Sequence, residues 1–169
     1  MKIKKARYFS SAVLLAGLLL WTACGYYSFK GALPPHIKTI AIPIFDSQTP
    51  DPGVAEKLNE LLMENFINDN TLKVVDESKA DLILNGTVLP IRVQPAVVRS
   101  GEEVAEDKLT VRVKVKCEDV KTSKVLFDQT FEHYVPLSIN ASLDDRQQAI
   151  DEALKIIADK ILNATFSTW

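Results

Sequence analysis

The sequence has few of the residues that build catalytic or metal centres. Its 169 residues include two cysteines, Cys24 and Cys117, and two histidines, His36 and His133, which are far apart. No Cys/His spacing typical of a metal site occurs, nor a nucleophile-elbow motif, a glycine-rich phosphate loop or a zinc-protease motif. The sequence therefore predicts a protein that is not an enzyme and that has no cofactor and no metal ion.

A long hydrophobic run is also missing. Residues 12–21 are almost wholly apolar, whereas a membrane-spanning helix needs about 20 apolar residues, and no such run follows. The run is preceded by a cluster of cations with no acid among them: Lys2, Lys4, Lys5 and Arg7. Together with the small residues Thr22 and Ala23, this pattern is typical of a secretory signal peptide.

A cysteine directly follows this leader, and the junction resembles the lipobox of bacterial lipoproteins. The resemblance implies cleavage after Ala23, a diacylglycerol on the Cys24 sulfur and a further acyl chain on its amine; two or more chains anchor a protein stably. The lipobox prefers leucine where this sequence has Trp21, so a signal peptide with a chance cysteine, or an uncleaved anchor, is the alternative. Gly25, by resemblance to the sorting rule of enteric bacteria, implies the cell outer membrane.

Length and charge limit the rest of the chain. We expect a signal peptide at 1–23, a lipidated N-terminus and extended segment at 24–38, and a single domain at 39–169. Without its leader the chain has 16 basic and 22 acidic residues, a net charge of about −6, which argues against nucleic acid as a partner. If Cys24 is lipidated, Cys117 has no disulfide partner, so packing must supply the stability.

The first half of the domain has one strand and one helix signal. Residues 39–45 predict a strand with Ile40, Ile42 and Ile44 on one face, and Pro43 predicts an edge position or a bulge. Asp51 and Pro52 suit the N-cap and first turn of a helix. Apolar residues at steps of three and four predict that this helix runs from about Gly53 to Asn68: Val54, Leu58, Leu61, Leu62 and Phe66.

The second half predicts strands followed by a helix. Residues 72–75 and 81–93 predict two apolar strands. Within the second one the apolar residues change from one face to the other, which requires a kink, and Gly86 or Pro90 can supply it. Residues 109–119 and 125–135 alternate apolar and polar side chains around a turn. Ser142 to Asp145 fits a capping box that opens a long helix ending near Phe166.

These elements indicate the fold class. No helix separates the strands after residue 70, so most of the sheet should be antiparallel. We expect an α+β, two-layer fold: a small, mostly antiparallel sheet with two helices packed on one face, in the order β-α-β-β-β-β-α.

Three cations share one face of the 109–119 strand. Arg112, Lys114 and Lys116 could bind the phosphates of an anionic lipid. The alternative is pairing across the hairpin. A turn about Thr122 would place Lys116 opposite Asp128, Arg112 opposite Glu132 and Lys114 opposite Thr130.

Other notable side chains have two interpretations each. The aromatic group Tyr26, Tyr27 and Phe29 suits a contact surface near a membrane interface, or a strand that packs on the core. His133 is expected to be a core or edge histidine, and Cys117 a small buried hydrophobe rather than a catalytic thiol.

Three stretches resemble the lipopolysaccharide-assembly lipoproteins of the LptE family: CGYYSFKGALPPHIKTIAIPIFDSQT (24–49), ADLILNGTV (80–88) and LTVRVKVKCEDVKTSKVLFDQTF (109–131). The resemblance implies a small sheet with two helices and a role without catalysis. Family members plug a large LptD-type outer-membrane β-barrel, assist its assembly and help deliver lipopolysaccharide to the cell surface.

Lipopolysaccharide contact in the family involves basic residues. By charge and position, the candidates here are Arg112, Lys114, Lys116, Arg92 and Arg99. The alternative function is that of a periplasm-facing outer-membrane lipoprotein that activates a peptidoglycan synthase. Such activators usually need a long linker, whereas the first strand here begins about fifteen residues after Cys24.

Overall fold

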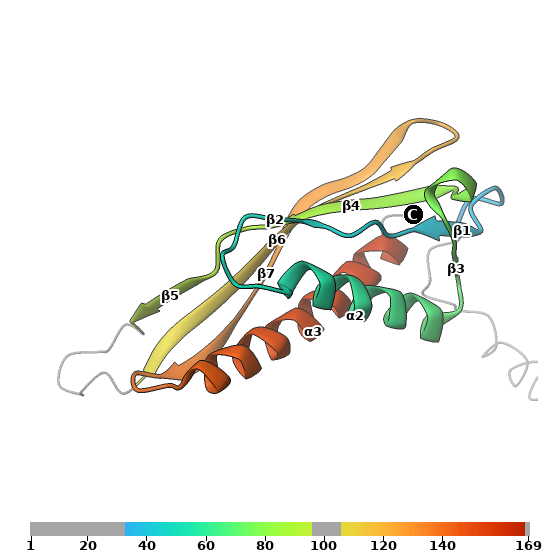
Figure 1. Cartoon of the computed structure of the whole chain (residues 1–169). Helices are drawn as coiled ribbons and strands as arrows, with labels where there is room; N and C mark the ends of the chain where they lie inside the picture. Colours follow the sequence, from blue (N-terminus) through green and yellow to red (C-terminus); the bar gives the residue numbers. More distant parts are fainter. Residues whose placement is uncertain (1–32, 96–105, 168–169) are drawn as a thin grey trace, which may run out of the picture. The chain divides into compact units, whose positions relative to one another are not determined.

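A long hairpin of two strands organises the fold (Figure 1). The computed structural model describes residues 33–95 and 106–167. Strand β6 (Glu106–Asp119) pairs with β7 (Lys124–Ser138) along its whole length. Both strands are longer than the alternating patterns at 109–119 and 125–135 predicted: β6 begins three residues earlier, and β7 begins one residue earlier and ends three residues later.

The other strands lie on the opposite side of β6 from β7. Strands β4 (Leu82–Val88) and β5 (Arg92–Pro95) pair with successive parts of β6, and β1 (Thr39–Ala41) pairs with β4 and with β3 (Lys73–Val74). The short strand β2 (Asp46–Ser47) also pairs with β4. The pairs made by β1 and β2 are parallel and those made by β6 are antiparallel. The α+β class with a mostly antiparallel sheet is therefore confirmed, with two short strands more than predicted: β2, and β5, which is separate from β4.

Two helices cover one face of this sheet (Figure 1). Helix α2 (Val54–Asp69) packs on α3 (Leu143–Ser167), which contacts β6 and β7, and a 3-10 turn, η2 (Glu77–Lys79), precedes β4. The predicted stripe of α2 is buried, and so are Ile150, Leu154, Ile157 and Ile161 of α3. The apolar faces of the sheet and of both helices form one core.

The strand predicted at 39–45 is interrupted. Strand β1 ends at Ala41, and Ile44, which was expected to lie on the buried face, is 66% exposed. Pro43 has no N–H and cannot continue a ladder. Beside it, the side-chain amide of Asn59 donates hydrogen bonds to the carbonyl oxygens of Ile42 (2.9 Å) and Pro43 (3.1 Å), so α2 holds the break in place.

The predicted N-cap of α2 is wrong. The helix begins after Gly53, whose φ of 74° is left-handed and favours glycine, and no side chain caps it. The Asp51 carboxylate is instead bound by Arg146 of α3 at 3.1 Å. The capping box of α3 is confirmed: Ser142 N–H donates to the Asp145 carboxylate (2.9 Å), and Asp145 N–H donates to the Ser142 hydroxyl (3.1 Å).

The predicted kink in 81–93 lies at Pro90, in the gap between β4 and β5. Gly86 remains in the ladder, where it serves a different purpose. A Cβ on Gly86 would lie 2.4 Å from the ring of Phe45 and 2.9 Å from the carbonyl oxygen of Lys114. Because glycine leaves this space, the Phe45 ring can enter the core.

Candidate functional site

The sheet face turned away from the helices is polar and basic along β6. Here we call it the outer face; it carries the side chains of β6 that alternate with the buried ones. Its cations on β6 are Lys108, Arg112, Lys114 and Lys116. The register across the hairpin is the predicted one, with Lys116 opposite Asp128, Arg112 opposite Glu132 and Lys114 opposite Thr130.

The ion pairs differ from those that the register alone suggests. Lys114 Nζ lies 3.6 Å from the Asp128 carboxylate, which is one row away, and Lys116 Nζ lies 2.6 Å from Glu118 on the same strand. The hydrogen bond from Lys116 to Glu118 raises the pKa of Lys116. Two of the three predicted cations are therefore paired, but with other partners than predicted.

Arg112 is the exception. Its Nε is buried and has no hydrogen-bond partner among the residues that the structure describes, and Glu132 forms no ion pair with it. A guanidinium prefers planar, bidentate contacts with carboxylates or phosphates. Arg112 is thus the cation of the outer face that most clearly lacks a ligand.

Two further cations extend the basic surface. Arg92 of β5 is exposed and lies opposite Thr110, next to Arg112 along β6. Lys108 was missed, because the alternating pattern was read only from Leu109; its Nζ lies 3.9 Å from the ring centroid of Tyr134, a cation–π contact. The remaining predicted residues, Cys24, Arg99 and the aromatic group Tyr26, Tyr27 and Phe29, lie outside the described residues.

A shallow hollow of about 220 Å³ lies on this face beside β4. It is lined by two lysines, Lys114 and Lys116, by Asn85 and Thr87, and by two carboxylates, Asp46 and Asp128. The hollow offers ammonium groups together with amide and hydroxyl groups, all of which can donate hydrogen bonds to phosphate oxygens.

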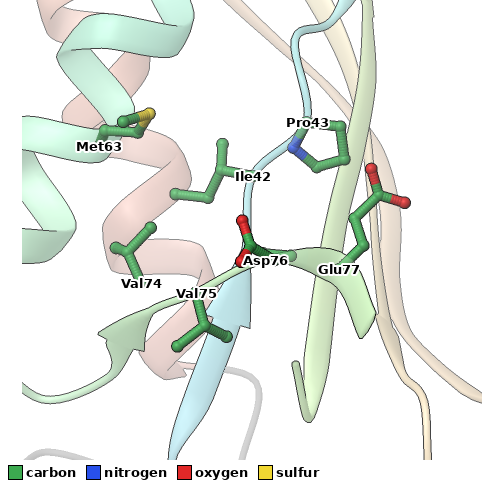
Figure 2. Close-up of a pocket in the computed structure, with 8 residues that line it drawn as sticks. Ile42, Pro43, Met63, Val74, Val75, Asp76 and Glu77 are labelled. Atoms are coloured by element: carbon green, nitrogen blue, oxygen red, sulfur yellow. The ribbon is translucent and has the colours of Figure 1, made fainter. Parts of the chain in front are cut away.

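Figure 2 shows a second hollow, of about 470 Å³, with different chemistry. Ile42 and Pro43 line one side, and Met63 of α2 and Val74 of β3 line the other. Its ionisable groups are carboxylates, on Asp76 and Glu77. An anionic ligand is therefore better suited to the outer face than to this hollow.

The turn end of the hairpin is held by buried polar contacts. Asp119 is 3% exposed and accepts hydrogen bonds from His36 Nε2 (2.8 Å), the Thr122 hydroxyl (2.8 Å), and the backbone N–H groups of Lys121 and Thr122. Burial raises the pKa of Asp119, but these hydrogen bonds, that from His36 first, outweigh it and lower the pKa to about 2. His36, in the segment that resembles the family, therefore ties the start of the domain to the hairpin.

The other single residues are structural. Cys117 is fully buried, and burial, followed by the charge of Asp119, raises the pKa of its thiol to about 12, which makes it a poor nucleophile at neutral pH. His133 is partly buried on the inward phase of β7. Within 33–95 and 106–167 no three His, Cys, Asp or Glu side chains are grouped to hold a metal ion. None of the helices in these ranges is long and apolar enough to cross a membrane.

Comparisons with solved structures show the same fold elsewhere. Protein XCC0632 from Xanthomonas campestris matches with a TM-score of 0.62 at 15% identity, over 81% of this chain and 88% of that chain. A minor lipoprotein from Acinetobacter baumannii matches with a TM-score of 0.55 at 14% identity, over 77% and 93%. Uncharacterized lipoprotein B from Nitrosomonas europaea matches with a TM-score of 0.54 at 15% identity, over 85% and 92%.

Comparisons of sequence identify the family. No curated protein sequence matches the chain. The LptE family model, described as lipopolysaccharide-assembly, matches residues 37–165, which include every described strand of the sheet and nearly all of α3. The chain therefore belongs to the LptE family of lipopolysaccharide-assembly proteins.

Proposed function

We propose that this protein is a non-catalytic lipoprotein of the outer membrane that plugs an LptD-type β-barrel, assists its assembly and takes part in lipopolysaccharide transport to the cell surface. The observation that carries the proposal is the outer face of the sheet, which is polar and basic and which neither of the described helices, α2 and α3, covers. Membership of the LptE family supports the link to lipopolysaccharide.

The outer face suits the inside of a barrel. The wall of a large outer-membrane barrel is apolar where it meets lipid and polar on its lumen side. On β4, β6 and β7, the outer face offers threonine hydroxyls among charged groups: Thr87, Thr110 and Thr130. Such a surface can bind a polar wall through hydrogen bonds and water, without requiring a dry apolar contact.

Arg112 is the residue best suited to bind lipopolysaccharide. Its buried Nε, which has no partner in the described part of the chain, and its position in a row of cations favour a charge-assisted contact with a phosphate. Arg92, Lys114, Lys116 and Arg99 are proposed as further contacts. Lys114 and Lys116 would exchange their present carboxylate partners for phosphate, so we expect them to contribute less than Arg112.

The anchor completes the proposal. Lipidation of Cys24 would place two or more acyl chains in the membrane, which is enough for stable attachment without a membrane-spanning helix. Leu33 is nine residues beyond Cys24, so an extended connection spans at most about 30 Å. The domain would therefore act close to the membrane.

The first test is purification of the tagged protein from native outer membranes in mild detergent, followed by mass spectrometry. We expect a large β-barrel protein in near-stoichiometric amount. Recovery of a peptidoglycan synthase without any barrel would refute the plug and support the role of a synthase activator.

The second test concerns the cations. We expect Arg112→Gln to weaken binding of purified full-length protein to lipopolysaccharide about tenfold, the effect of losing one charge-assisted contact. Lys155→Gln on α3 removes a charge from an exposed position elsewhere and should leave binding unchanged. Equal losses in both variants would show that binding depends on total charge rather than on this face.

A further inference from the structure

Strand β7 forms an open edge of the sheet. It pairs with β6 on one side, and none of the other described strands pairs with it. The carbonyl oxygen of Glu132 accepts a hydrogen bond from Lys160 Nζ at 2.7 Å, so it points away from β6. In an antiparallel ladder the N–H and C=O groups of alternate residues point outward together. The outward N–H groups therefore belong to Thr130, Glu132 and Tyr134, all exposed, and among the described residues no acceptor is found for them.

Two features of this edge limit which strands can pair with it, but they do not prevent pairing. Pro136 is also an outward position, where its missing N–H costs no ladder bond. Lys160 covers one carbonyl with a charge, a common protection of edge strands against indiscriminate pairing. Both devices restrict what can add to the edge: a partner must do without a bond from residue 136 and must give Lys160 another acceptor.

Two hollows lie along the same edge, where β7 meets α3. One, of about 310 Å³, is lined by His133 and by Lys160 from α3. The other, of about 290 Å³, is lined by Leu137 and by Asp145 and Glu152 from α3. Since His133 and Leu137 are four residues apart on one strand, about 13 Å separates their Cα atoms.

The residues of α3 that line the two hollows differ in charge: Lys160 is a cation, and Asp145 and Glu152 are acids. Burial, followed by the charge of Lys160, lowers the pKa of His133, and the charge of Glu152 only partly opposes this shift, so the imidazole is neutral at pH 7 and Lys160 supplies the positive charge. The other four residues that line the first hollow, Lys108, Thr110, Glu132 and Tyr134, carry their side chains on the outer face, so the hollow spans the edge of β7, and His133 and Lys160 line it on the side of α3. Beside Leu137 the ionisable groups are the carboxylates of Asp145 and Glu152.

We propose that the free edge of β7 binds an extended strand of a partner protein, with a carboxylate side chain opposite His133 and a cationic one opposite Leu137. Residues opposite each other across a ladder point to the same face, so these two side chains would enter the two hollows. Backbone bonds to Thr130, Glu132 and Tyr134 would hold the strand, as in other cases of strand addition. The inference does not rest on the proposed function, because a partner of any role can supply such a strand.

A second copy of this chain fits the edge less well. Two β7 edges could pair about a two-fold axis, but each would then offer its own inward residues to the other: Phe131, His133, Val135 and Leu137. None of these is a carboxylate, so Lys160 would lose its contact with Glu132 and gain no acidic partner. Charge complementarity thus favours a different chain.

The test uses a synthetic strand and the full-length protein in detergent micelles. The peptide has eleven residues that alternate valine and threonine, except for lysine at its third and glutamate at its seventh position, so its tenth residue lies opposite Thr130. Antiparallel addition places these opposite Leu137 and His133. We expect amide hydrogen exchange at Thr130, Glu132 and Tyr134 to slow at least tenfold when the peptide binds. Unchanged exchange at these three amides would refute the proposal, and so would their protection by self-pairing in the absence of peptide.

Matched variants separate backbone pairing from charge. Glu132→Pro and Glu132→Thr both remove the same carboxylate, but only the proline removes an outward N–H. We expect the proline variant to bind the peptide at least tenfold more weakly than the threonine variant, with thermal unfolding confirming that both are folded. Equal affinity would exclude strand addition.

A charge exchange tests the stated partner chemistry. We expect Lys160→Glu to weaken binding of the lysine–glutamate peptide at least fivefold and to strengthen binding of a twin peptide with lysine at both positions. A purely structural effect of the substitution would weaken both peptides alike, and that outcome would refute the predicted carboxylate.

Discussion

On the inner face of β6, Leu109, Val111 and Val113 are fully buried, whereas on the outer face the buried Nε of Arg112 has no hydrogen-bond partner within 33–95 and 106–167. Packing on the inner face leaves little free space: the Phe45 ring fills the room that Gly86 leaves by having no side chain. Even a buried charged residue of that phase, Asp119, has four hydrogen bonds. The same strand thus carries stability on one face and unsatisfied binding groups on the other.

The strongest test of this comparison removes packing from the inner face. We expect Leu109→Ala to lower the free energy of unfolding by about 3 kcal/mol, because it removes buried methyl groups and leaves a cavity. Lys114→Ala on the outer face should change it by less than about 0.5 kcal/mol, since its ion pair is exposed. Denaturant unfolding of the full-length protein measures both. Similar losses would mean that the outer face also contributes to stability.

The second test overfills the inner face. We expect Gly86→Ala to cost about 2 kcal/mol of unfolding free energy, because the new Cβ would collide with the Phe45 ring and the Lys114 carbonyl. Combining it with Phe45→Leu should cost less than the sum of the two single substitutions, since the smaller side chain makes room. Strict additivity in the double variant would show that the ring and residue 86 do not compete for the same space.

The sequence predicts the two faces of β6 well and the partners of individual charges poorly. Alternation with period two is local, and the predicted register of Lys116 and Asp128 is confirmed. The turn alone does not produce this register: Asp119 lies opposite Lys124, and a β-bulge beside Cys117 and Glu118 shifts the pairing by one residue. A lysine side chain is long enough to reach a neighbour on a diagonal or along its own strand. The ion pair between Lys114 and Asp128 therefore could not be predicted from the register alone.

Contacts between distant parts of the chain had no local signal. Asp51 has the sequence context of an N-cap, but its carboxylate is bound by Arg146, 95 residues later. His36 and Asp119, which are 83 residues apart, meet only because β1 and β6 flank β4. Likewise, the space that Gly86 leaves is explained only by the folded position of Phe45. Lys108 could have been found by extending the alternating pattern by one residue.

The third test asks whether the charge of Asp119, on the inner face of β6, stabilises the folded protein. In the folded protein the pKa of Asp119 is about 2, below its usual value of 3.8. A lowered pKa stabilises the folded state above the unfolded pKa, and this contribution is lost as the pH falls toward 2. We therefore expect Asp119→Asn to cost about 2 kcal/mol of unfolding free energy at pH 7 and progressively less between pH 4 and pH 2.

Unfolding curves of wild type and Asp119→Asn across this pH range make the comparison. Other carboxylates titrate in both proteins, so the difference between the two curves isolates Asp119. A matched substitution of an exposed acid, Asp128→Asn, should show no comparable convergence. If the difference stayed constant down to pH 2, the hydrogen bonds of Asp119 would not depend on its charge.

The smallest expected effect lies on the outer face, at Tyr134. Its ring is 54% exposed and lies 3.9 Å from Lys108 Nζ, and exposed cation–π contacts contribute about 0.5–1 kcal/mol. A double-mutant cycle of Tyr134→Leu and Lys108→Met should give a coupling energy near the lower end of this range. Because the contact is exposed, it leaves Lys108 able to turn toward an anion at little cost. A coupling energy above about 2 kcal/mol would mean that Lys108 is fixed as firmly as the inner face, and that this end of the outer face is structural rather than open for binding.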